Sequence, residues 1–336
     1  MSLTATKTEL QAARTALARA QRILAITHIA PDGDAIGSVL GFGLALRAAG
    51  KDVVMACADP VPDVFRFLPS VGDITAAPQG EFDYVVALDA SDLGRIGPIA
   101  ELLNRPPDLL FDHHITNTGF ARINCIDVEA ASAAELVTEL LPDLGLRLDP
   151  DVAQALLTGL VNDTLGFRTS NTTVKTLGLA QQLMLAGGNL QQVYDQSLFK
   201  RSYTAVRLWA EGLARMQMKH RMVWARLPLD ARQAAGFQGI GDADLINVLT
   251  SVREADVALV FVERGDGKVK VSWRAVPGIN VAAVASQFGG GGHAPAAGAE
   301  VAGTMDDVEA QVLAATRAAM RAARAEPEPE PAEAQP

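Results

Sequence analysis

The chain has 336 residues, of which 49% are hydrophobic, and a formal net charge of −10 at pH 7. Its length favours two domains that each bury a core, and its acidic balance argues against a general nucleic-acid binder. No apolar run approaches the roughly 18 residues of a membrane span, and the start of the chain lacks a signal-peptide pattern. We therefore expect a cytoplasmic protein with no membrane partner.

The first half of the chain alternates predicted strands and helices. A helix over residues 1–20 is expected before the first strand, and Gly50 is expected to close the second helix. Short apolar runs bounded by polar turns are typical of strands buried on both faces of a parallel sheet. The predicted strands are RILAIT, DVVMACA, YVVALDA and PDLLFDHH, and the later helices cover DPDVAQALLTGLVND and TVKTLGLAQQLMLAGG. An α/β domain with right-handed crossovers is predicted over 1–190.

The second half predicts a different organisation. Residues 191–218 are expected to form a helical connector, and 219–320 a smaller α/β domain with strands RMVWARL, ADVALVFVE and KVKVSWRAV. Gly265-Asp266-Gly267 predicts a hairpin between the last two strands. The segment 321–336 alternates Pro and Glu and is predicted to be a disordered acidic tail.

Charge is unevenly distributed along the second half. Between Lys200 and Arg274 there are 13 Lys and Arg against 8 Asp and Glu, a local excess of +5 in an acidic chain. A solvated charged surface is one interpretation. A docking face for a small anionic substrate is the other.

Histidines and aspartates gather where predicted strands or helices end, the edge at which open parallel sheets bind ligands. Each aspartate alone is equally typical of a helix N-cap or a turn. Together, imidazoles and carboxylates are ligands for divalent ions such as Mn²⁺, whereas carboxylates alone suit Mg²⁺ better. The candidate ligands, His28, Asp32, Asp34, Asp89, His113 and Asp163, are more than one ion with open positions would use, so two ions are expected.

A second candidate site is the glycine-rich stretch FGGGGHAPAAG, residues 288–298. Consecutive glycines allow backbone N–H groups to converge on an anion, and His293 can donate a hydrogen bond to a phosphate. Arg274 ends a predicted strand and can bring a guanidinium to the same anion. A flexible turn is the alternative interpretation.

Five motifs in this order resemble the DHH/DHHA1 phosphoesterases. THIAPDGDAIGS, VALDASD, DHHITN and VNDTLGF match the four DHH motifs, and GGGGHAPAAG is similar to the DHHA1 signature. The resemblance spans residues 20–318. It implies an N-terminal DHH domain with a mainly parallel sheet flanked by helices, followed by a smaller α/β DHHA1 domain. The chain is most similar to the NrnA-type members, which implies hydrolysis of RNA of about two to five nucleotides and removal of the 3′-phosphate from pAp.

The resemblance also implies residue roles. One ion would be held by His28, Asp32 and Asp89, and a second by Asp34, Asp89, His113 and Asp163, with Asp89 as the bridge. The implied catalytic residues are Asp89, His114, which would face the scissile phosphate, and Asp112, which would orient a ligand histidine. The implied substrate-binding residues are Arg274, Gly290, Gly291, Gly292, His293 and Ser38. The implied mechanism is hydrolysis by a hydroxide shared between two ions, expected to be Mn²⁺, with Mg²⁺ and Co²⁺ as alternatives.

Other readings stay open. A RecJ-like exonuclease for single-stranded DNA shares the catalytic motifs but usually carries an added nucleic-acid-binding module, for which the sequence after residue 320 has no room. A soluble phosphodiesterase for cyclic or linear dinucleotides, and a catalytically silent nucleotide sensor, are further alternatives. Short single-stranded DNA as an additional substrate and a homodimeric assembly are also open.

Overall fold

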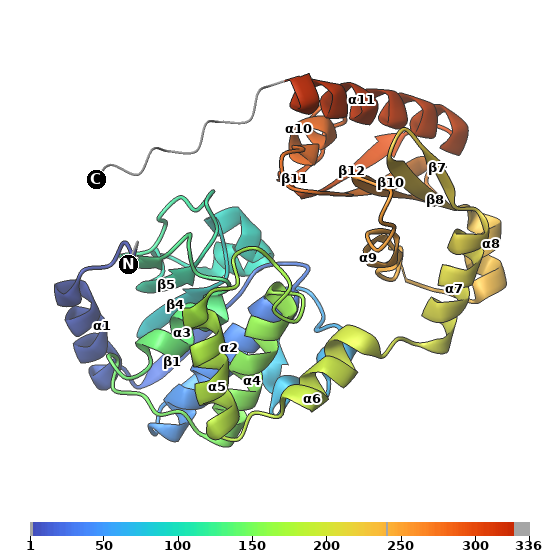
Figure 1. Cartoon of the computed structure of the whole chain (residues 1–336). Helices are drawn as coiled ribbons and strands as arrows, with labels where there is room; N and C mark the ends of the chain where they lie inside the picture. Colours follow the sequence, from blue (N-terminus) through green and yellow to red (C-terminus); the bar gives the residue numbers. More distant parts are fainter. Residues whose placement is uncertain (1–2, 240, 326–336) are drawn as a thin grey trace. The chain divides into compact units, whose positions relative to one another are not determined.

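The computed structural model describes residues 3–239 and 241–325 (Figure 1). The chain divides into two compact units between Lys200 and Arg201. The described helices include none that is long and apolar enough to cross a membrane.

The first unit contains a six-stranded sheet in the order β3-β2-β1-β4-β5-β6, and every neighbouring pair is parallel. Its strands are β1 (Arg22–Ile26), β2 (Asp52–Ala56), β3 (Ile74–Thr75), β4 (Tyr84–Leu88), β5 (Leu109–Asp112) and β6 (Ile123–Ile126). The order reverses between β1 and β4, and such a switch point opens a crevice beyond the carboxyl ends of the two strands. The parallel α/β prediction is confirmed.

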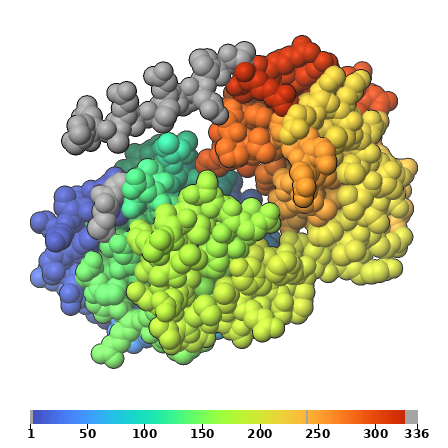
Figure 2. All heavy atoms as spheres, viewed as in Figure 1, coloured from blue at the N-terminus to red at the C-terminus, as the bar shows by residue number. Residues whose placement is uncertain are grey.

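Both faces of this sheet are buried, as the apolar strand sequences predict. Ile23 and Ala25 of β1 pack toward the helices of one face, while Leu24 and Ile26 pack toward the 3₁₀ segment η3 (Leu93–Leu102) on the other. The helices are α1 (Lys7–Arg19), α2 (Gly33–Ala48), α3 (Ala133–Leu140), α4 (Pro150–Asp163) and α5 (Val174–Leu185), with short 3₁₀ turns η1 (Asp63–Phe65) and η2 (Val71–Asp73). Helix α5 packs on α4 and forms an outer surface of the unit (Figure 2).

Helices α2 and α4 lie unusually close together, and small residues make this possible. A Cβ on Gly37 would lie 2.5 Å from the Gly159 amide nitrogen and 2.6 Å from the Ala155 carbonyl oxygen. The contact brings the first turn of α2, with Asp34, next to the end of α4, with Asp163.

The predicted connector, 191–218, is divided between the two units. Its first part is α6 (Leu190–Val193) and the π-helix η4 (Tyr194–Phe199), which contact α4 of the first unit. Its second part, α7 (Tyr203–Ala214), buries Leu208 in a core of the second unit with Val223. The two helical parts are followed by the start of β7 at Gln217, and their apolar side chains belong to two cores.

The second unit contains a six-stranded sheet in the order β11-β12-β10-β9-β8-β7, parallel between β8 and β9 and otherwise antiparallel. Its elements are β7 (Gln217–Lys219), β8 (Met222–Leu227), α8 (Leu229–Ala235), α9 (Leu245–Leu249), β9 (Val257–Glu263), β10 (Lys268–Ala275), α10 (Val281–Ser286), β11 (Gly291–His293), β12 (Ala296–Ala302) and α11 (Met305–Ala325). The hairpin predicted at Gly265–Gly267 is confirmed as β9–β10. Helices α10 and α11 contribute to the core on one sheet face, and α7 and α9 to the core on the other.

The end of the chain differs from the prediction over five residues. The tail was expected to be disordered from residue 321, but α11 continues to Ala325 because RAARA follows the same helical pattern and Met320 is buried. The Pro-Glu part of the predicted tail, residues 326–336, lies outside the described residues.

The close contact between α2 and α4 predicts a selective effect of an added methyl group. Gly37→Ala places a Cβ against backbone atoms that cannot rotate away, and we expect a loss of about 1–3 kcal/mol in the free energy of unfolding. Denaturation followed by far-UV circular dichroism measures this loss. Gly178→Ala in α5 is the matched control, since nothing lies within 4 Å of its added Cβ, and it should stabilise the chain by about 0.5–1 kcal/mol. Equal effects of the two substitutions would contradict the packing argument.

Candidate active site

The predicted metal ligands converge at the carboxyl ends of β1, β4 and β5. His28 follows β1 and Asp89 follows β4, so both lie at the switch point of the sheet. His113 follows β5, and Asp34 and Asp163 are supplied by α2 and α4. The structure therefore brings together side chains that are 135 residues apart in the sequence at their extremes.

Asp89 is the centre of this group. Its side chain is 2% exposed, with Oδ2 3.4 Å from His28 Nε2 and Oδ1 3.8 Å from His113 Nε2 and 3.7 Å from His114 Nδ1. Its backbone adopts a left-handed conformation, φ 55°, which is strained for a non-glycine residue and typical of functional positions. The Asp89 N–H donates to the Phe111 carbonyl at 2.8 Å, which joins the turn to β5.

One oxygen of Asp89 is left without a hydrogen-bond donor. Oδ1 is buried and accepts no hydrogen bond from any of the described residues. A buried carboxylate oxygen in this state is costly unless a cation pairs with it. This orphaned oxygen fits a metal ligand.

The ligand atoms form three contiguous groups, in each of which they lie within 4.8 Å of one another. Asp89 is a member of two groups and His113 of two. The groups are His28, Asp32 and Asp89; Asp34, His113 and Asp163; and Asp89, His113 and His114. Mixed imidazole and carboxylate donors at this spacing fit divalent transition-metal ions.

The histidine rings are oriented by contacts on their other nitrogen atoms. His28 Nδ1 lies 2.7 Å from the Ile29 carbonyl oxygen, and His113 Nδ1 lies 3.3 Å from the Ala130 carbonyl oxygen. The carbonyl acceptor of His113 places the proton on Nδ1 and leaves Nε2 as the ligand atom, whereas His28 Nδ1 also lies 3.1 Å from Arg95 Nη2, a donor. Both Nε2 atoms face the aspartates.

Asp112 is hydrogen-bonded to His114 and not to one of the histidines predicted to bind metal. Its Oδ1 accepts from His114 Nδ1 at 2.7 Å, and its Oδ2 accepts from the side-chain amide of Asn117, which also donates to the Ala90 carbonyl at 3.0 Å. The orienting role predicted for Asp112 therefore applies to the histidine expected to face the phosphate. Asn117 lies within DHHITN, yet its contact with Asp112 was not recognised from the sequence.

Asp34 is anchored by a helix that the sequence reading missed. Its side chain is 1% exposed, and its two oxygens accept from the backbone N–H groups of Ala133 at 2.6 Å and Ala134 at 2.9 Å, in the first turn of α3. A helix N-terminus stabilises a carboxylate through these donors and the helix dipole.

The acidic residues carry more negative charge than the surrounding protein neutralises. Burial raises the pKa of Asp163 to about 7, opposed by His113 and reinforced by the charge of Asp89. Burial, together with the charges of Asp89 and Asp163, also raises the pKa of Asp34 well above its usual range. The metal-free site therefore holds protons near neutral pH in place of cations.

The histidines respond in the complementary direction. Burial lowers the pKa of His28, but its contacts with Asp32 and Asp89 outweigh burial and raise the pKa to about 10. Burial likewise lowers the pKa of His114, and the hydrogen bond to Asp112 with the charge of Asp89 raises it to about 9. The electrostatic field at this edge of the sheet therefore favours the protonated, positively charged form of both imidazoles.

Ser38 does not contribute to the site surface. It lies on α2 with no exposed side-chain area, and its hydroxyl donates to the Ala35 carbonyl at 3.3 Å. The predicted contact of Ser38 with substrate is therefore corrected: its small side chain faces the packed interior of the first unit.

In the second unit, Arg274 and His293 lie in one row across the sheet. Arg274 of β10 is paired with Ala296 of β12, which is paired with His293 of β11. Directly paired residues of antiparallel strands project to the same face. The two predicted phosphate contacts thus share a sheet face, with only a small alanine between them.

Part of the glycine run belongs to a hairpin, formed by β11 and β12. Gly291 and Gly292 belong to β11, and a Cβ on Gly290 would lie 2.2 Å from the Gly298 carbonyl oxygen. Gly292 has φ 142°, and a Cβ there would lie 2.4 Å from the Ala296 carbonyl oxygen. Close strand pairing therefore accounts for the glycines at 290 and 292.

Comparison with known proteins identifies relatives across both units. The family model described as "DHH family, N-terminal domain" matches residues 22–160, and the one described as "DHHA1 domain" matches residues 240–322. A bifunctional oligoribonuclease and PAP phosphatase, NrnA, from Thermus thermophilus is 35% identical over 300 residues, covering 87% of this chain and 88% of the relative.

Two solved structures share the fold. An exopolyphosphatase-related protein from Bacteroides fragilis is 24% identical, with a TM-score of 0.88 over 96% of this chain and 99% of its own. RecJ from Thermus thermophilus, in complex with Mn²⁺, is 15% identical, with a TM-score of 0.55 over 98% of this chain and 56% of its own.

Protons and metal ions are expected to compete at this site. Because the pKa of Asp163 is about 7, its carboxylate is mostly protonated at pH 6 and mostly ionised at pH 8. Ligands bind metal in their deprotonated form, so the association constant for Mn²⁺ should rise from pH 6 to pH 8, by about tenfold per pH unit for each proton displaced. Calorimetric titration of the metal-free protein in a pH series measures this.

Asp163→Asn tests the assignment of the titrating group. The amide cannot ionise, so Mn²⁺ affinity should fall and its rise with pH should become shallower. Glu129→Gln, at an exposed position, is the matched control and should behave as the unmodified chain. An affinity independent of pH in the unmodified protein would contradict the competition.

Proposed function

Because the chain belongs to the DHH family and carries the DHHA1 domain, and is therefore a hydrolase, we propose that it cleaves short oligoribonucleotides, of about two to five nucleotides, to mononucleotides and removes the 3′-phosphate of pAp. The Thermus relative with these two activities in its name aligns along 87% of the chain. The observation that carries the proposal is the buried Asp89 carboxylate, whose orphaned oxygen lies among imidazole and carboxylate ligands.

The site would hold two divalent ions. His28, Asp32 and Asp89 would hold one, and Asp34, Asp89, His113 and Asp163 the other, with Asp89 shared between them. When bound, the ions supply an acidified water as nucleophile and neutralise charge on the reacting phosphate. The mixture of imidazole and carboxylate ligands favours Mn²⁺ over Mg²⁺.

The remaining side chains of the first unit orient these groups. Asp112 accepts from Nδ1 of His114 and so fixes the ring beside Asp89, at 3.7 Å. The negative charge of Asp112 stabilises an imidazolium, and such a ring donates a hydrogen bond to a phosphate oxygen through Nε2. His114 would thus bind the scissile phosphate, and Asp112 would position it.

The second unit would bind another part of the substrate. Arg274 and His293 project from one row of the sheet, and a guanidinium presents paired donors that match a phosphate. Burial lowers the pKa of Arg274, opposed by Asp242 and Asp244, and the side chain remains cationic at neutral pH. Arg274 and His293 would bind a phosphate group of the substrate other than the one at the cleaved bond.

Initial rates across substrates test the proposal. With Mn²⁺, RNA of two, three and five nucleotides and pAp should be hydrolysed quickly, and RNA of about 24 nucleotides slowly. Matched single-stranded DNA and linear and cyclic dinucleotides complete the series. A preference for long single-stranded DNA would contradict the proposal and favour a RecJ-like exonuclease, and hydrolysis of cyclic dinucleotides alone would favour a dinucleotide phosphodiesterase.

Substitutions separate the chemistry from substrate binding. Asp89→Asn removes the shared carboxylate charge and should lower kcat on every substrate by about a thousandfold or more. Arg274→Ala should raise KM by about 10- to 100-fold, the value of a charged hydrogen bond, with little change in kcat. His293→Ala should act in the same direction. Equal loss of kcat in all three variants with unchanged KM would refute this division of roles.

A further inference from the structure

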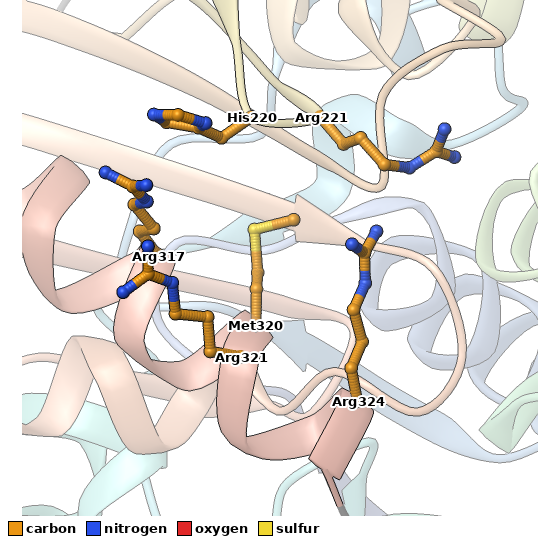
Figure 3. Close-up of a pocket in the computed structure, with 6 residues that line it drawn as sticks. All are labelled: His220, Arg221, Arg317, Met320, Arg321 and Arg324. Atoms are coloured by element: carbon orange, nitrogen blue, oxygen red, sulfur yellow. The ribbon is translucent and has the colours of Figure 1, made fainter.

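A cluster of basic side chains in the second unit lies apart from Arg274 and His293. Arg317, Arg321 and Arg324 follow one another at helical spacing along the last turns of α11, and His220 with Arg221 forms the turn between β7 and β8. Together with Met320 they line a cavity of about 240 Å³ (Figure 3). We refer to these five basic residues as the α11 basic cluster.

The cluster lies on the opposite sheet face from Arg274. Met320 packs in the core that contains Val271 and Trp273 of β10. Val271 and Trp273 alternate along β10 with Ser272 and Arg274, and alternate residues of a strand project to opposite faces. The α11 basic cluster is therefore separate from the row that would bind the substrate.

Positive charge in the cluster exceeds the nearby negative charge. Asp256 accepts from Arg221, with Nε–Oδ2 2.8 Å, and also pairs with Arg324. Neither Arg317 nor Arg321 forms an ion pair within residues 3–239 and 241–325. Four guanidinium groups and Lys219 against the carboxylates of Asp256 and Glu254 leave a local charge of about +3 with His220 neutral.

Repulsion between the positive charges of the cluster destabilises helix α11. Arg317 and Arg321 are four residues apart on α11, a spacing at which like charges repel. Slight burial and the neighbouring charges of Arg317, Lys219 and Arg321 lower the pKa of His220. A bound anion would relieve the repulsion in both places.

The turn that carries His220 and Arg221 is strained. Both residues have positive φ, 55° and 62°, between the paired residues Lys219 and Met222. A two-residue hairpin turn of this kind is formed without strain by Asn-Gly. Here two basic side chains occupy positions that disfavour them, and strain of this kind is typical of functional positions.

We propose that the α11 basic cluster is a binding site for an anion that carries two or more phosphate groups. The charge of about +3 matches such an anion, and the lining consists of guanidinium and imidazole N–H donors with Met320 as its one apolar member. The ligand is therefore recognised by its phosphates and not by its bases. A free diphosphate and the backbone of a nucleic-acid strand share this chemistry.

Inorganic pyrophosphate is the first probe, added to the full-length protein in EDTA so that the acidic metal site repels it. Calorimetry measures the affinity, and the ¹H–¹³C NMR signal of the His220 ring, assigned with His220→Asn, reports binding at the cluster. We expect the His220 signal to move on titration and its pKa to rise, because the anion offsets the charge of Arg317 and Arg321. Arg274→Ala with His293→Ala is carried as the background chain, so that the substrate row does not contribute.

Variants separate this site from nonspecific attraction. Arg317→Gln with Arg321→Gln should weaken pyrophosphate binding at least tenfold, while Arg253→Gln, which removes one exposed charge of the same unit, should change it less than twofold. His220→Asn with Arg221→Gly keeps a turn-compatible sequence and should weaken binding while the circular dichroism spectrum is retained. Binding that all these variants leave intact, or a His220 signal that does not move, would overturn the proposal.

Two further arms identify the source of the phosphates. Tighter binding of a single-stranded RNA in EDTA, lost in the Arg317→Gln and Arg321→Gln variant, would assign a strand backbone; pyrophosphate binding alone would assign a small diphosphate. The sequence also continues after Ala325 with Glu326, Glu328, Glu330 and Glu333. If pyrophosphate binds only after all four are changed to Gln, the acidic segment of the chain itself is the occupant, and the assignment to a phosphate ligand is overturned.

Discussion

The buried negative charge of Asp89 is the constraint on which the rest of the site depends. A carboxylate that is 2% exposed and has an oxygen without a donor is unfavourable in any fold that offers no cation. Three histidines lie within 3.8 Å of it, and the left-handed turn that holds it is tied to β5 by a backbone hydrogen bond. The sheet topology makes this possible, because the strand order reverses where β4 and β1 meet.

The same logic extends outward from Asp89. Asp34 can remain at the centre because the first turn of α3 donates two N–H groups to it, and α3 is in place because α2 and α4 pack closely beside it through glycine contacts. Two kinds of compensation therefore operate: fixed backbone dipoles stabilise Asp34, while Asp89 and Asp163 depend on imidazoles and on cations from solution. The donors of Asp112, His114 and Asn117, lower its pKa despite burial, whereas burial raises the pKa of Asp163 to about 7 and that of Asp34 well above its usual range.

The side chains that converge around Asp89 could be selected from the sequence because each lies in a compact motif at the end of an apolar run or helix. Asp34 and Asp89 could be selected as candidates without knowing which residues contact them in the fold. The parts that were not predictable depend on contacts between distant segments: the amides of Ala133 and Ala134 reach Asp34 across about 100 residues of sequence. Ser38 was misassigned for a related reason, since a small polar residue after a motif is equally compatible with a tight helix contact.

The glycine run shows how one sequence pattern can serve two physical demands. Backbone freedom for anion binding and space for close strand pairing both select glycine, and only the register with β12 separates them.

A charge count along a stretch of sequence is ambiguous too, because it does not show which charges are paired with residues outside that stretch. The excess of +5 between Lys200 and Arg274 is partly offset by acids outside that stretch, since Arg226 pairs with Asp306 and Glu309, and Arg264 with Glu300. Arg317 and Arg321 of α11, which lack such partners among the described residues, lie outside the stretch in which charges were counted. A surface charge excess becomes informative only after the ion pairs are subtracted. By that criterion Arg317 and Arg321 at the end of α11 keep their positive charge, on the sheet face opposite Arg274.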